Sequence, residues 1–143
     1  MTNEEKLAEV RARRAELDRN RAERDAARAL EEQIEAETRA LADAEAIAKA
    51  EEEHGPVGKR IAPVHTDLGV IILKRPNPVL FRRFQDQGKT THEALDKLVR
   101  PSVVYPDGSS FDRILDELPA TMTLCANAVC VLAGVRTEEA SGK

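Results

Sequence analysis

The stretch ATMTLCANAVCVLAG, residues 120–134, decides how the second half of this chain must fold. Its only polar side chains before Gly134 are Thr121, Thr123 and Asn127. Apolar residues at helical spacing predict a helix that is apolar most of the way round, and such a helix must be surrounded. A domain of about 80 residues buries only some 60–65% of its unfolded surface and rarely encloses a helix completely. Two alternatives stay open: a central core helix, or a helix whose outer face meets a partner.

A β-hairpin and three helices are expected before this segment. The β-branched runs 60–65 and 69–74 flank the turn residues Thr66-Asp67 and predict the hairpin, with Pro63 placing its first strand at a sheet edge. The helices are expected at 78–87, 91–105 and 111–118.

Capping signals set the bounds of these helices. Asn77 suits the N-cap of the first, and Gly88 suits the left-handed residue that ends it. TTHE, residues 90–93, has the form of a capping box with Thr90 as the cap of the second, which Pro101 kinks or divides. The expected caps of the third helix are Ser109 or Ser110.

The N-terminal part has a different composition. Residues 3–53 are dominated by Ala, Glu, Arg and Leu, with neither Gly nor Pro, which favours one long helix of about 75 Å. Thr2 or Asn3 can cap it, and Gly55-Pro56 ends it. Its large apolar residues follow two heptad phases offset by one residue, which is too interrupted for a regular parallel coiled coil. Weak self-association, docking on a larger partner and a solvated helix all stay open.

Composition excludes several functions. The net charge of −4 and the absence of Trp argue against a dedicated nucleic-acid binder. No apolar run approaches the roughly 18 residues of a membrane span. The N-terminus lacks the apolar core of a signal peptide, so we expect a cytoplasmic protein.

Catalytic and metal-binding patterns are thin. Gly88-Lys89-Thr90 resembles the end of a phosphate-binding loop, but Arg83 occupies the place of the required first glycine. Cys125 and Cys130 lie about 140° apart around one helix, and both are expected to be buried free thiols. No histidine has ligand spacing. We expect a protein that is not an enzyme and has no catalytic residues, metal or cofactor.

The sequence therefore predicts a mainly α protein, with a long N-terminal helix followed by a small α+β domain made of a β-hairpin plus four short helices. The expected boundaries are 1–54 for the helix, 55–136 for the compact domain and 137–143 for a disordered tail.

Residues 60–135 resemble the tail assembly chaperones of tailed bacteriophages. The resemblance is carried by Lys74-Arg75-Pro76 after the hairpin, FRRF at 81–84, VVYPD at 103–107, and Pro119 before the closing apolar helix. It implies a non-catalytic protein in the cytoplasm of the infected bacterial host. Such a protein binds the tape measure protein and aids assembly of the tail tube, with the tail tube protein as a further partner.

We expect the closing helix to provide the client surface, in helix-in-groove fashion. The hypothesised partner-binding residues are Phe81, Phe84, Met122, Leu124, Val129, Val131 and Leu132. An alternative is a structural virion or assembly protein that forms a homo-oligomer through its N-terminal helix. A small DNA-binding regulator is disfavoured by the net charge.

Overall fold

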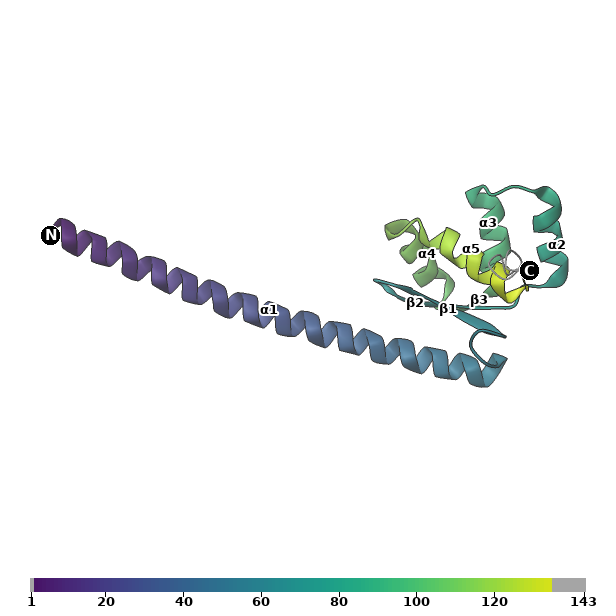
Figure 1. Ribbon diagram of the computed structural model, residues 1–143, viewed down its shortest axis with the longest axis horizontal. Helices are drawn as coiled ribbons and strands as arrows, with labels where there is room; N and C mark the ends of the chain where they lie inside the picture. Colours follow the sequence, from purple (N-terminus) through teal and green to yellow (C-terminus); the bar gives the residue numbers. More distant parts are fainter. Residues whose placement is uncertain (1, 135–143) are drawn as a thin grey trace, which may run out of the picture. The chain divides into compact units, whose positions relative to one another are not determined.

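The structure, a computed structural model, describes residues 2–134, which form a mainly α protein (Figure 1). Contacts divide the described residues into two compact units, one that ends at Leu41 and one that begins at Ala42. In chain order the elements are α1 (Asn3–His54), β1 (Ile61–Thr66), β2 (Gly69–Lys74), α2 (Pro78–Gln87), α3 (His92–Val99), the 3-10 turn η1 (Arg100–Ser102), β3 (Val103–Tyr105), α4 (Gly108–Glu117) and α5 (Thr121–Leu132).

The first unit is the amino-terminal part of α1. The backbone N–H of Glu5 donates to Thr2 Oγ1, and the N–H of Thr2 donates back to Glu5 Oε2, both at 3.2 Å. This reciprocal pair is a capping box, and it confirms Thr2 as the cap. Every described side chain of this unit is exposed, including all the large apolar ones.

The second unit is built on a three-stranded antiparallel sheet of order β1-β2-β3. The predicted hairpin is confirmed, with Ile61 opposite Lys74 and Thr66 opposite Gly69. β1 is an edge strand, as its proline predicts. The strand pattern of β2 is a continuous apolar run, since Val70 to Leu73 are all buried. Such a run requires cover on both faces of the sheet.

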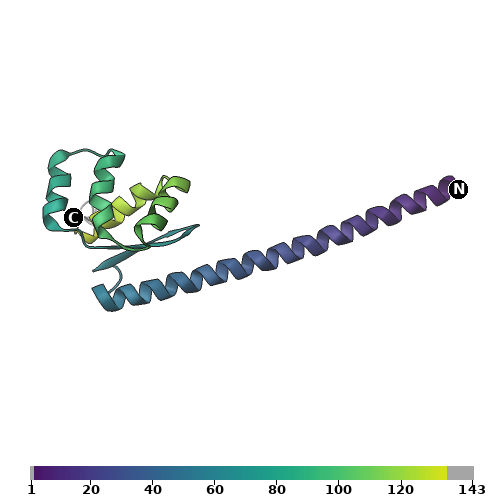
Figure 2. The same cartoon turned by 180° about the vertical axis from the view of Figure 1, so that it is seen from behind.

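Helices cover each face of this sheet (Figures 1 and 2). Ile71 and Leu73 point into the larger core, which α3, α4 and α5 complete. Val70 and Ile72 point the other way, together with Ile61, and pack against Ala46, Ile47 and Ala50 of α1. Asp43 Oδ1 accepts a hydrogen bond of 3.0 Å from the backbone N–H of Val70. The last turns of α1 are thus part of the compact unit, which begins at Ala42 and not at the expected residue 55.

Two expectations about local structure were wrong. The helix expected at 91–105 ends at Val99, and Val103–Tyr105 forms the third strand, paired with β2. The caps of α3 and α4 are Thr91 and Asp107, which accept from the backbone N–H groups of Ala94 and Ser110, and not Thr90 or a serine. The expected tail, 137–143, lies outside the described residues.

Gly88 has φ 61°, so α2 ends in the left-handed residue that was predicted.

Candidate functional site

One side of α5 is a core helix face. Met122, Cys125, Val129 and Leu132 are buried at 0–5% exposure and pack against α3, α4 and the sheet. Burial raises the pKa of the Cys125 thiol to about 12, because the thiolate would lose its hydration there. This side anchors the helix and leaves its opposite side to be explained.

The opposite side carries two large apolar side chains in solvent. Leu124 is 52% exposed and Val131 is 54% exposed. Seven residues turn a helix through about 700°, so the two side chains lie within about 20° of one line along the helix, two turns apart. The half-buried Ala128 lies between them. We call Leu124, Ala128 and Val131 the α5 face.

The hypothesised partner-binding residues of α5 are therefore divided between core and surface. Leu124 and Val131 are accessible, whereas Met122, Val129 and Leu132 are 2%, 0% and 5% exposed. The expectation that the last three contribute to a partner surface was wrong for Met122 and Val129, because enclosed side chains cannot contact a partner. Leu132 is almost entirely buried, but its exposed edge lines a groove and can still contact a partner there.

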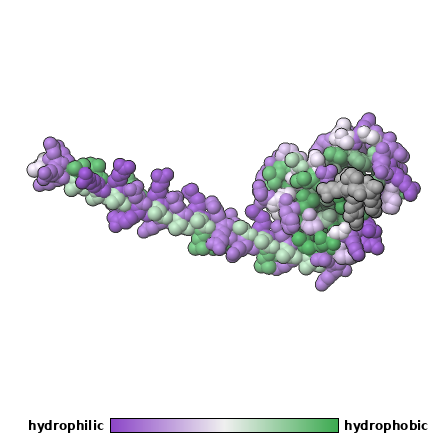
Figure 3. Space-filling view, in the orientation of Figure 1, coloured by the Kyte–Doolittle hydropathy of each residue, from purple (hydrophilic) through white to green (hydrophobic). Residues whose placement is uncertain are grey.

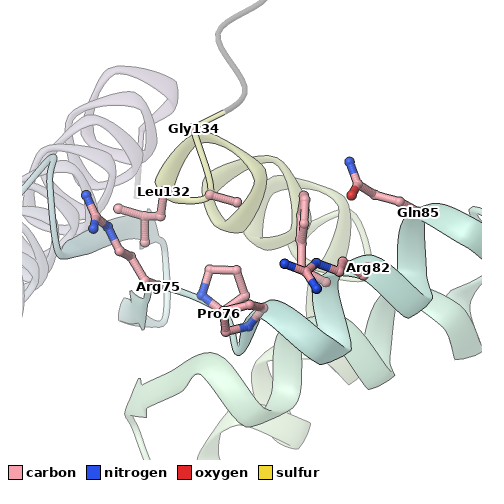
Figure 4. Close-up of a pocket in the computed structure, with 9 residues that line it drawn as sticks. Arg75, Pro76, Arg82, Gln85, Leu132 and Gly134 are labelled. Atoms are coloured by element: carbon pink, nitrogen blue, oxygen red, sulfur yellow. The ribbon is translucent and has the colours of Figure 1, made fainter.

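This groove lies where the carboxyl end of α5 meets the start of α2 and the link that precedes it. It has a volume of about 560 Å³. Figure 4 shows Arg82 and Gln85 of α2 on one side, Arg75, Leu132 and Gly134 on the other, and Pro76 between them. We call it the basic groove, and its lining residues are Arg75, Pro76, Pro78, Phe81, Arg82, Gln85, Leu132, Ala133 and Gly134.

The charge of the basic groove comes from two guanidinium groups. Arg75 Nε donates to the backbone carbonyl of Lys59 at 2.8 Å, which fixes the side chain and leaves its terminal nitrogens available. Within residues 2–134, neither Arg75 nor Arg82 forms an ion pair. Arginines held beside apolar side chains suit a ligand that brings a carboxylate together with an apolar group.

The structure separates the two phenylalanines of α2. Phe81 is half-buried and lines the basic groove, so it borders the α5 end as expected. The Phe84 ring lies 6.4 Å from the Phe81 ring, between centroids, but it lines a different hollow of about 300 Å³ between α2 and α3. Only Phe81 joins the candidate surface. Arg75 and Arg82 were not among the predicted partner residues, because nothing in the local pattern relates them to residue 132.

The described residues contain no group of three or more His, Cys, Asp or Glu that could hold a metal ion. Cys125 and Cys130 are free thiols, Cys125 buried and Cys130 only half-buried. In the part of the chain that the structure describes, no helix is both long and apolar enough to cross a membrane. This surface can bind a partner through apolar side chains that lie beside the guanidinium groups of Arg75 and Arg82.

No protein-family model matches this chain, and no curated protein or solved structure is significantly similar to it. Function must therefore be inferred from the residues and surfaces themselves.

Proposed function

We propose that this protein is a non-catalytic phage tail assembly chaperone, which holds an amphipathic helical segment of the tape measure protein on the α5 face while the tail tube assembles. The observation that carries the proposal is the exposure of Leu124 and Val131 on one line of a helix whose other side is fixed in the core. The proposal is also supported by the resemblance of residues 60–135 to such chaperones.

The spacing of these side chains suits a helical client. Leu124 and Val131 are seven residues apart, which matches the i, i+7 spacing of the apolar stripe on an amphipathic helix. Grooves recognise amphipathic helices through side chains at this spacing. The core side of α5 fixes the helix backbone that carries both side chains, so the backbone loses little entropy when a client docks. Ala128, small and half-buried between them, allows a client helix to approach closely.

The basic groove at the carboxyl end of α5 offers a second contact surface, and its residue Leu132 follows Val131 in the chain. Phe81 and Leu132 provide apolar contact there, and Arg75 and Arg82 provide charge. A client helix with an acidic residue beside its apolar stripe would be favoured over a purely apolar one, because charged contacts at a surface rim contribute more to selectivity than to affinity.

The test is co-purification with the tape measure protein after co-expression. Val131→Glu should reduce the bound fraction at least about tenfold, because it places a charge where an apolar contact forms. The domain should stay folded, with a free energy of unfolding within about 0.5 kcal/mol of the parent, because the side chain is half in solvent.

Val79→Glu is the matched control. Val79 is 55% exposed on α2, almost the same as Val131, but it belongs neither to the α5 face nor to the lining of the basic groove. It should leave co-purification unchanged. Equal loss of client in both variants, or unfolding of the domain by Val131→Glu, would contradict the proposal.

A structural role organised by α1 is the second candidate. It is favoured by the exposure of every large apolar side chain between Asn3 and Leu41. Removing residues 1–41 separates the two candidates. If the α5 face is the binding site, the truncated protein should still bind the client. If α1 is the binding site, client binding and self-association should be lost together.

A further inference from the structure

The amino-terminal part of α1, Asn3–Leu41, is here called the arm. All of its side chains are exposed, and Figure 3 shows its apolar residues as green patches along a mostly purple helix. Most helix stability in proteins comes from packing an apolar face rather than from intrinsic propensity. The arm has six large apolar side chains in solvent, and we therefore expect a binding partner to cover them. They are Leu7, Val10, Leu17, Leu30, Ile34 and Leu41, at 50–63% exposure.

These side chains form two separate stripes. The amino stripe is Leu7, Val10, Arg14 and Leu17, and the carboxyl stripe is Leu30, Ile34, Glu37 and Leu41. Thirteen residues separate Leu17 from Leu30, which leaves these two side chains about 140° apart around the helix axis. Along a straight helix, the two stripes cannot both face one neighbour.

The stripes match each other in chemistry when read in the same chain direction. Each has two apolar residues, then a charged residue, then an apolar one, and the charges are opposite. Two parallel helices staggered by 23 or 24 residues place Arg14 beside Glu37. The same stagger gives three apolar pairs: Leu7 with Leu30, Val10 with Ile34, and Leu17 with Leu41.

An antiparallel pairing of the same stripes does not match. It sets Val10 against Glu37 and Arg14 against Ile34, so two charges lose hydration without gaining a partner. Neither Arg14 nor Glu37 is in an ion pair within the described residues, so both are available.

The net charges around the stripes agree with the parallel pairing. Residues 6–18 hold 4 basic and 3 acidic side chains, a net charge of 4 − 3 = +1. Residues 29–41 hold 1 basic and 4 acidic side chains, a net charge of 1 − 4 = −3. The segments that the stagger places together therefore attract each other.

We propose that the arm binds the arm of a second copy of this chain, parallel and staggered, with the amino stripe of one copy on the carboxyl stripe of the next. The interface is heterologous, because two different surfaces meet. Each pair leaves one amino stripe and one carboxyl stripe free, so association continues beyond two copies. The proposal does not involve the α5 face.

Sedimentation of the full chain over a wide concentration range tests this arrangement. The weight-average mass should rise with concentration and pass that of a dimer. Arg14→Glu and Glu37→Arg should each shift this rise to about tenfold higher concentration, because each sets like charges together. The double variant Arg14→Glu/Glu37→Arg should restore the parent behaviour, because the ion pair is re-formed with its charges exchanged.

Arg19→Glu is the control, since Arg19 lies on the same helix but outside both stripes and outside the two charged segments, 6–18 and 29–41. It should behave like the parent chain, and circular dichroism should show the same helix content in all variants. Three outcomes would overturn the proposal: a mass that stays at the monomer, a mass that stops at the dimer, and a double variant as weak as the single ones. The first of these would leave a different protein as the occupant of the arm.

Discussion

The two thiols of α5 have different environments, although only five residues separate them. Cys125 is fully buried, and its pKa is raised to about 12. Cys130 is half-buried next to Val131, and burial raises its pKa as well. The thiolate is the reactive form, so access and pKa act in the same direction. Cys130 is therefore a natural reporter beside the α5 face, because it is the residue next to Val131 in the chain.

A thiol-reactive dye at pH 8 should label Cys130 first and Cys125 at least about a hundredfold more slowly. Because the pKa of each thiol is raised, the labelling rate should increase with pH across the range from 8 to 9, as the thiolate fraction grows. A bound client should slow the labelling of Cys130. In the Cys130→Ser variant, labelling of the folded protein should nearly disappear and return in denaturant. Equal rates for the two thiols in the folded protein would contradict this assignment.

At the scale of elements, one arginine joins the end of α3 to α4. Arg100 Nη2 lies 2.9 Å from Asp96 Oδ1 and 2.8 Å from Asp112 Oδ1, and its guanidinium lies 5.3 Å from the centroid of the Phe111 ring. Hydrogen bonds to Asp96 and then Asp112 raise the pKa of Arg100. The carboxylates are partly in solvent, so each pair contributes at most about 1 kcal/mol.

Arg100→Ala should lower the free energy of unfolding by about 1–2 kcal/mol, since both pairs and the contact with the Phe111 ring are lost. Arg100→Lys should recover only part of this, because an ammonium cannot bridge two carboxylates in the geometry of a guanidinium. Chemical denaturation measures both changes. Arg113→Ala, which removes an exposed pair with Glu117, should stay within about 0.5 kcal/mol of the parent. A loss for Arg100→Ala no larger than for Arg113→Ala would contradict the bridging role.

Elements with local signals were predictable, and those defined by distant contacts were not. Asn77 and Gly88 mark the ends of α2 in the sequence, and Pro63 marks an edge strand. β3 has three residues, and it is a strand only because it pairs with β2. Thr90 and Thr91 are equally good caps by residue type. Which of them caps α3 depends on the backbone conformation of the turn that precedes the helix.

The candidate surface was predictable in part for the same reason. The composition of α5 indicates a surplus of apolar positions, but the side that becomes core depends on how α3, α4 and the sheet pack around it. Helical spacing puts Met122 and Val129 on one side and Leu124 and Val131 on another. Both sides are apolar, so the sequence alone could not tell which of them becomes core. The basic groove joins residues 75–85 with 132–134, a contact that only the folded chain reveals.

For the whole molecule, the helix and the unit of folding do not have the same boundary. The sequence indicates one break, at Gly55-Pro56, where α1 ends. The contacts place the break at Leu41, inside the helix. A turn signal marks where a helix stops, but it carries no information about which part of the helix packs on a sheet. The alanines at 46 and 50 give little periodic signal, although they cover the second face of the sheet.

Truncation at these two boundaries should therefore give opposite results. A chain starting at Ala42 should fold with nearly the parent free energy of unfolding, because residues 1–41 make up a separate unit. A chain starting at Gly55 should lose its cooperative unfolding transition, because Ile61, Val70 and Ile72 lose the cover of Ala46, Ile47 and Ala50. Exposing such side chains costs about 1.5–3 kcal/mol each when complete, which approaches the whole stability of a small domain. Thermal melting followed by circular dichroism distinguishes the fragments, and a sharp transition from the shorter one would show that the sheet needs no helix on its second face.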